Sequence, residues 1–198
     1  MASIYDLKPA FQNRLRPAAA KLAAAGVTAN QVTLAALALS LLAGLVLAAS
    51  GGGWVFLLLP PLFLARMALN ALDGMLARGY GQQSRLGAVL NEICDVISDA
   101  ALILPFALVP RLDAGLIVLL ALLAAIVEFA GLLSQALGGA RNYAGPLGKS
   151  DRALAFSLLA ILVGCGWAGG WLAALLLWLL LLLALLTLWN RLRAAVRA

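Results

Sequence analysis

The chain consists of long apolar stretches that are interrupted by glycine, proline or charged residues. A helix needs about 20 mostly apolar residues to cross the hydrocarbon core of a bilayer, and most of these stretches have that length. The pattern therefore predicts an all-α, polytopic membrane protein with six transmembrane helices. To within a few residues, the predicted helices cover 29–49, 54–78, 86–109, 114–137, 149–164 and 171–193. The proline pair at 60–61 predicts a kink in the second helix.

Residues 1–27 precede the first apolar stretch and follow a different pattern. Apolar side chains recur on one helical face and basic side chains flank them: Leu7, Phe11, Leu15 and Leu22, with Lys8, Arg14 and Lys21. This pattern predicts an N-terminal amphipathic helix that lies in the interfacial headgroup layer. The alternative is a basic juxtamembrane segment that only sets topology, because Pro9 and Pro17 limit a helix. A cleavable signal peptide is not expected, since the first apolar run is long enough to span.

Composition supports a membrane protein. Of the 198 residues, 65% are hydrophobic and 11% are charged, and the mean hydropathy is +1.04. A soluble domain of this size would need a polar face on every helix, which the C-terminal apolar run lacks. A single membrane-embedded domain over 1–198 is therefore expected.

The basic residues are divided unequally between the two sides of the membrane. With six spans, both termini share one side with the loops after the second and fourth helices. That side holds all of the 14 Lys and Arg residues except Arg111. By the positive-inside rule it is the cytoplasmic side. Anionic lipid headgroups account for the net charge of +6, and no nucleic-acid partner is expected.

The stretch from Asn70 to Asp99 departs from the apolar pattern, because it places four acids and two Asn in predicted membrane helices. Carboxylates inside a membrane are costly, and they mark functional sites by default. The polar and small residues fall on one face of each helix: Asn70, Asp73 and Ala77 on the second, and Gly87, Asn91, Asp95 and Asp99 on the third. A short turn joins the two helices, so the two faces can meet near the cytoplasmic surface.

The available side chains limit the chemistry of this stretch. The chain has no His, and its two Cys residues lack the spacing of metal ligands. Carboxylate and amide oxygens suit a hard cation such as Mg²⁺, Mn²⁺ or Ca²⁺, and Arg78 and Arg85 can bind phosphates. Two alternatives are a bundle held by buried polar contacts and an ion pathway in a transporter. Polar contacts between helices seldom use so many acids, and the chain shows no internal repeat, so a metal–phosphate site is favoured.

The pattern D-G-x2-A-R-x8-G-x3-N-x3-D, from Asp73 to Asp95, resembles the signature of the CDP-alcohol phosphotransferase (CDP-alcohol phosphatidyltransferase) family. The segment G-V-T-A-N-Q-V-T-L at 26–34 is similar to the family's entry to its first helix. The resemblance implies a six-helix membrane enzyme, commonly a homodimer, that uses Mg²⁺ or Mn²⁺. It implies phospholipid synthesis: transfer of a substituted phosphate from CDP-diacylglycerol or a related CDP-lipid to an alcohol, with release of CMP.

The resemblance also implies a role for each signature residue. Metal ligands are expected at Asn70, Asp73, Asn91 and Asp95. The CDP moiety is expected against Gly74, Ala77, Arg78 and Gly87. Asp95 corresponds to the general base that deprotonates the acceptor hydroxyl, and Arg78 assists at the phosphate. In a chain without His, a carboxylate is also the base that the composition allows.

Two positions depart from the family's pattern of four Asp, since Asn70 and Asn91 replace the first and third. Each change keeps an oxygen ligand and removes a negative charge, which predicts weaker metal binding unless other acids compensate. The candidates for compensation are Glu92, Asp99, Glu128 and Asp151. The departures resemble a poorly assigned bacterial branch of the family, which implies a multi-pass protein of the bacterial inner membrane. A catalytically inactive homologue that still binds ions or nucleotides is the alternative.

The acceptor is expected near the fourth loop and the start of the fifth helix, where Arg141, Lys149 and Arg152 gather. One interpretation is an anion pocket for an alcohol that carries its own phosphate. The other is that these residues set topology and contact lipid headgroups. The sequence leaves both interpretations open, and with them an acceptor with or without a phosphate.

Overall fold

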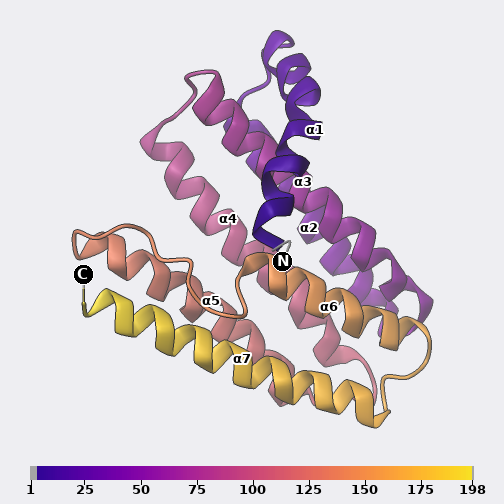
Figure 1. The fold of residues 1–198 in the computed structure, drawn as a ribbon. Helices are drawn as coiled ribbons and strands as arrows, with labels where there is room; N and C mark the ends of the chain where they lie inside the picture. Colours follow the sequence, from indigo (N-terminus) through magenta and orange to yellow (C-terminus); the bar gives the residue numbers. More distant parts are fainter. Residues whose placement is uncertain (1–3, 198) are drawn as a thin grey trace. The chain divides into compact units, whose positions relative to one another are not determined.

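The computed structural model describes residues 4–197 and is helical throughout its regular structure, so the all-α prediction is confirmed (Figure 1). The elements, in chain order, are α1 (Ile4–Ala24), α2 (Ala29–Ser50), η1 (Gly53–Leu58), α3 (Leu59–Gly79), α4 (Arg85–Ile103), η2 (Leu104–Leu108), α5 (Ala114–Ala136), α6 (Lys149–Gly164) and α7 (Trp171–Ala195), where η marks a 3-10 helix. The side chains of Leu7 and Lys8, which the amphipathic pattern includes, lie outside the described part.

The described helices agree with a polytopic membrane protein. Four helical stretches among these residues are long and apolar enough to cross a bilayer: Ala29–Ser50, Gly53–Gly79, Ala114–Ala136 and Trp171–Ala195. The other two predicted spans differ in kind. Helix α4 carries Arg85, Glu92, Asp95 and Asp99 within its length. Helix α6 has 16 residues, which is about 24 Å and shorter than the hydrocarbon core of about 30 Å. The count of six spans stays a prediction.

The proline pair marks a change of helix type. The 3-10 helix η1 ends at Leu58, and Pro60 and Pro61 lie in the first turn of α3. Proline lacks a backbone N–H, and the first turn of an α-helix has no intrahelical partner for that group. The pair therefore fits the start of α3.

The chain forms two compact units. Unit 1 comprises Met1–Leu39 and Leu64–Asp95, and unit 2 comprises Ser40–Phe63 and Val96–Ala198.

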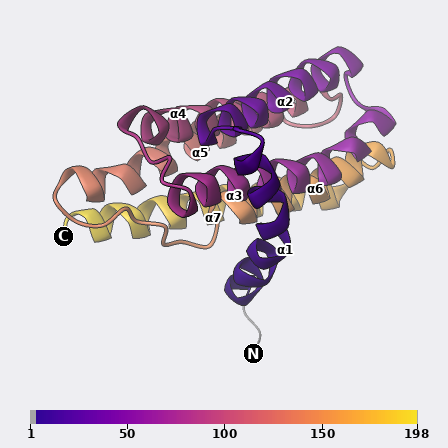
Figure 2. The same ribbon diagram turned by 90° about the horizontal axis from the view of Figure 1, so that it is seen from above.

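In unit 1, helix α1 packs on the start of α2 and the last turns of α3. The small core contains Ala19, Ala29, Val32, Leu72 and Leu76, with Leu15 and Leu22 packed against it. Figure 2 shows α1 running across the direction of α3. The N-terminal helix therefore exists, continues through Pro9 and Pro17, and turns part of its apolar face toward protein.

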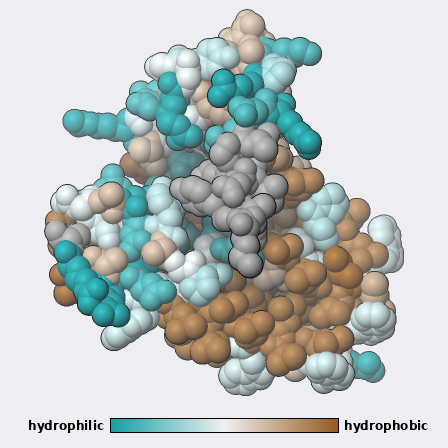
Figure 3. All heavy atoms as spheres, in the orientation of Figure 1, coloured by the Kyte–Doolittle hydropathy of each residue, from teal (hydrophilic) through white to brown (hydrophobic). Residues whose placement is uncertain are grey.

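In unit 2, α5 and α7 lie side by side over much of their length (Figure 1). The core includes three aromatic rings in contact, with centroids 4.9 Å apart for the edge-to-face pair Phe56 and Phe106 and 5.6 Å apart for the tilted pair Phe106 and Phe156. Leucines of α7 such as Leu175 and Leu182 are more than half exposed. Figure 3 shows an apolar surface along the side where α7 lies in Figure 1, with hydrophilic side chains toward its C-terminal end. This surface suits contact with lipid.

Candidate functional site

The predicted signature residues all lie in unit 1, on α3 and the first half of α4. The turn between these helices is fixed to the start of α2 by Gln82. Its Oε1 accepts a hydrogen bond from the Ala29 backbone N–H at 2.6 Å, and its Nε2 donates to the Val27 carbonyl at 3.4 Å. Thr28 and Gln31 form a capping box at that start, with reciprocal bonds of 3.2 and 2.9 Å. Three helix ends are thereby held together within unit 1.

Asp73 is buried, with 5% of its surface exposed, and faces α2. The Thr33 hydroxyl lies 2.9 Å from Asp73 Oδ2 and 3.1 Å from the Ala29 carbonyl, and can donate to either oxygen. A hydrogen bond to the charged carboxylate stabilises that form in a buried position. Thr33 is not among the residues that the sequence pattern predicts for the site. Its signal was its place in the segment at 26–34, which already resembled the family's first helix.

Asp95 joins α4 to α3 through two side chains. Asn70 Nδ2 donates to Asp95 Oδ1 at 3.3 Å, and Arg66 Nη2 lies 3.5 Å from the same oxygen. Arg66 also donates to the Asp95 backbone carbonyl at 3.1 Å, while only 4% of its side chain is exposed. The sequence placed Arg66 among the topology-setting residues, although a basic residue within an apolar helix is expected to have a partner. Arg66 therefore belongs to the site as the residue that holds Asp95.

Two glycines of the signature make room for polar side chains. A Cβ on Gly74 would lie 2.8 Å from Arg78 Nη2, so the guanidinium folds back over the glycine. A Cβ on Gly87 would lie 2.8 Å from Asn30 Oδ1 and 3.1 Å from Ser84 Oγ. Ser84 also accepts a hydrogen bond from the Gly87 N–H at 2.9 Å, which caps the start of α4. Any larger residue at either glycine would displace these groups.

The remaining signature residues lie on the same helices with partial burial. Ala77 is half-buried on α3, Arg78 is exposed, and Asn91 is half-buried one turn before Asp95 on α4. The structure thus brings Asn70 and Asp95 into direct contact and joins Asp73 to α2.

The predicted donor set suits a hard divalent cation and carries two negative charges. Among the residues that the structure describes, no three His, Cys, Asp or Glu side chains gather as a metal site. The predicted ligands supply two carboxylates, on Asp73 and Asp95, and two amide oxygens, on Asn70 and Asn91. Mg²⁺ typically binds one or two carboxylates and completes its shell with water and substrate phosphates, so this set is sufficient.

Unit 2 contains a second polar cluster that is more deeply buried. Arg152 Nη2 lies 2.8 Å from Asp99 Oδ2 and 2.8 Å from Glu128 Oε1. Glu128 Oε2 accepts from Arg141 Nη2 at 3.1 Å and lies 3.4 Å from Arg191 Nη1. Arg152 and Arg191 are 4% and 1% exposed. The other members are candidate residues from the sequence, whereas Arg191 is predicted there only as one of the basic residues that set topology.

This cluster contains part of the predicted acceptor pocket. Arg141 and Arg152 both contact Glu128, while Lys149 is half-buried at the first residue of α6. Asp151 accepts a hydrogen bond from the Gly148 N–H at 3.0 Å and so caps α6. Asp99, Glu128 and Asp151 therefore have partners within unit 2, and Glu92 is half-buried in unit 1. That any of them supplies charge to the metal site stays a prediction.

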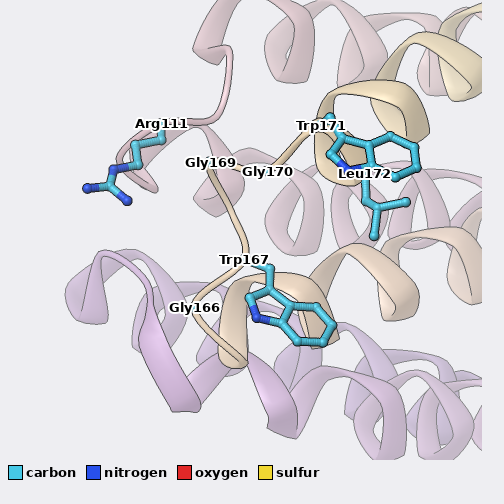
Figure 4. Close-up of a pocket in the computed structure, with 7 residues that line it drawn as sticks. All are labelled: Arg111, Gly166, Trp167, Gly169, Gly170, Trp171 and Leu172. Carbon is cyan, nitrogen blue, oxygen red and sulfur yellow. The ribbon is translucent and has the colours of Figure 1, made fainter.

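A shallow pocket of about 310 Å³ in unit 2 contains none of the predicted residues (Figure 4). It is lined by Arg111, Gly166, Trp167, Gly169, Gly170, Trp171 and Leu172. Figure 4 shows the Arg111 side chain extending away from both tryptophans. No acid lines this pocket, so it does not provide the carboxylates of the predicted chemistry.

Comparison with known proteins gives a family match over most of the chain. The family model described as CDP-alcohol phosphatidyltransferase matches residues 26–189 and so runs through both units. The inner membrane protein YnbA of Escherichia coli (strain K12) is 55% identical over 161 residues, which are 81% of this chain and 80% of that protein.

Two further relatives match about half of the chain. The phosphatidylinositol phosphate synthase of Mycolicibacterium smegmatis is 33% identical over 102 residues, 51% of this chain and 45% of that protein. The archaetidylinositol phosphate synthase of Pyrococcus horikoshii is 33% identical over 103 residues, 52% of each chain.

The fold is similar to that of a solved structure. The crystal structure of Mycobacterium tuberculosis phosphatidylinositol phosphate synthase (PgsA1) with CDP-DAG bound superposes with a TM-score of 0.75 at 22% identity. The superposition covers 90% of this chain and 92% of that one. A second structure of the same protein, in complex with manganese and citrate, gives a TM-score of 0.73 at 24% identity.

Proposed function

The chain belongs to the CDP-alcohol phosphatidyltransferase family and is a membrane transferase of that class, and on this premise we propose the reaction and the residues that perform it. The substrate is a CDP-linked lipid such as CDP-diacylglycerol, and the acceptor is an alcohol. The observation that carries the proposal is the contact of Asn70 and Arg66 with Asp95. In it, the Asp95 carboxylate of α4 accepts a hydrogen bond from the Asn70 amide of α3 and lies beside the Arg66 guanidinium.

The reaction is a displacement at phosphorus. The acceptor oxygen forms a bond to the lipid-bearing phosphorus, the bond from that phosphorus to CMP breaks, and CMP leaves with its oxygen. Asp95 accepts the hydroxyl proton, while Arg66 and Asn70 fix the orientation of the Asp95 carboxylate. Arg78 binds the donor phosphates, and Gly74 leaves room for the Arg78 guanidinium.

A divalent cation is part of the proposed site. Asn70, Asp73, Asn91 and Asp95 would hold Mg²⁺ or Mn²⁺, and the fit of the donor set supports this assignment. The bound cation would supply charge neutralisation at the pyrophosphate. The mycobacterial structure with manganese supports the choice of metal by analogy.

The cellular setting is proposed from the distribution of basic residues and from the family match. The protein is placed in a bacterial inner membrane, with the site and both termini in the cytoplasm, because all basic residues except Arg111 are predicted on one side. The family resemblance implies a homodimer. The family match from 26 to 189 supports a single membrane domain over 1–198.

Release of CMP tests this function directly. Purified protein with CDP-diacylglycerol, Mn²⁺ and a panel of alcohols is expected to release CMP and form a new phospholipid, identified by mass spectrometry. Asp73→Asn and Asp95→Asn are expected to abolish the release, because each removes a carboxylate from the site. Asp113→Asn is the matched control, since Asp113 caps α5 in unit 2.

Three outcomes would contradict the proposal. Full activity of either site variant would exclude the assigned site. Solute movement across liposomes without CMP release would indicate a transporter. Nucleotide binding without turnover for any alcohol would indicate an inactive homologue.

A further inference from the structure

The polar cluster of unit 2 has an acid at its centre. Glu128 contacts Arg141, Arg152 and Arg191, which we call the arginine cluster, at distances of 3.1, 2.8 and 3.4 Å. Both carboxylate oxygens are used, and only 10% of the Glu128 side chain is exposed. Three guanidinium groups from the α5–α6 loop, α6 and α7 thus converge on one carboxylate.

Two of the three arginines, Arg152 and Arg191, are held in place by contacts other than Glu128. Arg152 Nε and Nη2 both contact Asp99 Oδ2, at 3.1 and 2.8 Å, and its Nη1 donates to the Leu147 carbonyl at 3.3 Å. Arg191 donates to the carbonyls of Val127 and Ala144 at 2.7 and 3.2 Å. Because these bonds fix the guanidinium groups, the position between them is preformed for an anion.

A glycine makes this arrangement possible. A Cβ on Gly131, one turn after Glu128 on α5, would lie 2.7 Å from the Asn142 carbonyl oxygen and 3.0 Å from Arg191 Nη1. The Asn142 N–H also donates to the Gly131 carbonyl at 3.1 Å, which brings the loop close to the helix. The close approach of α7 and the loop to α5 therefore depends on the absence of a side chain at this point.

The charges of the cluster indicate what Glu128 does there. The three guanidinium groups and the two carboxylates, of Asp99 and Glu128, give the cluster a net charge of one positive. Without Glu128, two positive charges would remain, which matches a phosphate monoester dianion. Arginine forks bind phosphate and carboxylate with the same bidentate geometry. Glu128 therefore occupies the position and supplies the charge that a bound phosphate would.

We propose that Glu128 is a built-in anion that closes the arginine cluster to phosphate, so that the acceptor alcohol of this enzyme carries no phosphate group. The statement about the acceptor rests on the proposed transferase function, whereas the statement about phosphate exclusion does not. Glu128 is a specificity-determining residue in this account. Of the two acceptors that the sequence leaves open at Arg141, Lys149 and Arg152, with or without a phosphate, the proposal keeps the one without a phosphate.

Phosphate binding by a Glu128 variant tests the exclusion without any need for activity. Glu128→Ala removes the carboxylate and opens its position, so inorganic phosphate is expected to bind and raise the thermal unfolding temperature saturably. Wild-type protein is expected to show no such shift beyond that of chloride at equal ionic strength. The apparent affinity for phosphate should rise at least about tenfold, which corresponds to about 1.4 kcal/mol.

Asp99→Asn is the matched control, because it changes the net charge of the cluster by the same amount without opening the position of the Glu128 carboxylate. It removes one carboxylate from Arg152 but leaves Glu128 between the three arginines, so no saturable phosphate site is expected. A Glu128→Ala protein that folds and shows no gain over wild type would overturn the proposal, as would phosphate stabilisation of wild-type protein to the same degree. If Glu128→Ala does not fold, Glu128→Ser, which also removes the carboxylate and opens its position, and the wild-type titration decide by the same criteria.

Paired alcohols test the consequence for the acceptor. Wild-type protein with CDP-diacylglycerol and Mn²⁺ is offered glycerol or inositol, each with and without a phosphate group. CMP release with the uncharged member of a pair supports the inference, and release only with the phosphorylated member overturns it. Release with no alcohol at all would count against the proposed function, while the phosphate titration would still decide the role of Glu128.

Discussion

Replacement of Asn70 by Asp adds an acid beside Asp95 and tests the electrostatics of the proposed metal site. Asn70 Nδ2 lies 3.3 Å from Asp95 Oδ1. In Asn70→Asp, an oxygen with negative charge takes the place of that donor, so a hydrogen bond becomes a repulsion. At an effective dielectric constant of about 20, two unit charges at that distance repel by about 5 kcal/mol.

The observed loss of stability is expected to be smaller than this Coulomb value. Arg66 lies 3.5 Å from the same Asp95 oxygen and offsets part of the added charge, and the side chains can rotate apart. We expect the free energy of unfolding to fall by about 1–3 kcal/mol in the presence of EDTA. A divalent cation held by the two carboxylates would offset this repulsion, so Mn²⁺ should remove the loss.

The assay is thermal unfolding of wild-type and Asn70→Asp protein in EDTA and across a Mn²⁺ titration. The variant is expected to unfold earlier in EDTA, to gain more from Mn²⁺, and to reach half-maximal stabilisation at a lower concentration. Asn13→Asp adds the same charge at an exposed position of α1 and serves as the control. If the unfolding temperature of Asn70→Asp differs from that of wild type by the same amount in EDTA and in Mn²⁺, the placement of Asn70 at a cation site is refuted.

Two further substitutions test Arg66, which the structure adds to the candidate site, and Gly74, which gives the Arg78 guanidinium room there. Arg66→Met removes the buried partner of Asp95 and is expected to cost about 3–5 kcal/mol of stability and most CMP release; unchanged values in both assays would exclude Arg66 from the site. Gly74→Ala places a Cβ 2.8 Å from Arg78 Nη2 and should raise the KM for the CDP-lipid roughly tenfold by displacing the guanidinium. Gly79→Ala, where a Cβ meets nothing within 4 Å, should leave that KM unchanged, and an equal rise in both variants would contradict the explanation.

Much of the fold could be predicted because apolar stretches and their interruptions determine helix positions directly. The predicted 114–137 and 171–193 correspond to α5 (Ala114–Ala136) and α7 (Trp171–Ala195). Two predicted helices proved composite, since η1 precedes α3 and η2 follows α4. Hydropathy gives apolar content but does not distinguish a 3-10 turn from an α-helical one, so these changes of helix type were not visible.

Periodicity placed the signature residues on two helix faces, and the structure joins two of them, Asn70 and Asp95. The partners Thr33 and Arg66 were missed, because a spacing rule finds residues of one helix and not those that a neighbouring helix presents. Glu128 and Arg191 were missed as a pair for the same reason, since they are 63 residues apart in the chain.

These missed partners follow one physical rule, which is that buried charge within an apolar protein is matched locally. In unit 1, the buried Arg66 pairs with Asp95; in unit 2, Arg152 pairs with Asp99 and Glu128. The same rule offers a reason for the amide at Asn70. With Arg66 already beside Asp95, an amide at position 70 donates a hydrogen bond where an acid would repel in the absence of a cation. We therefore expect the reduced charge of the site to let the protein fold before a metal binds, and to lower its affinity for that metal.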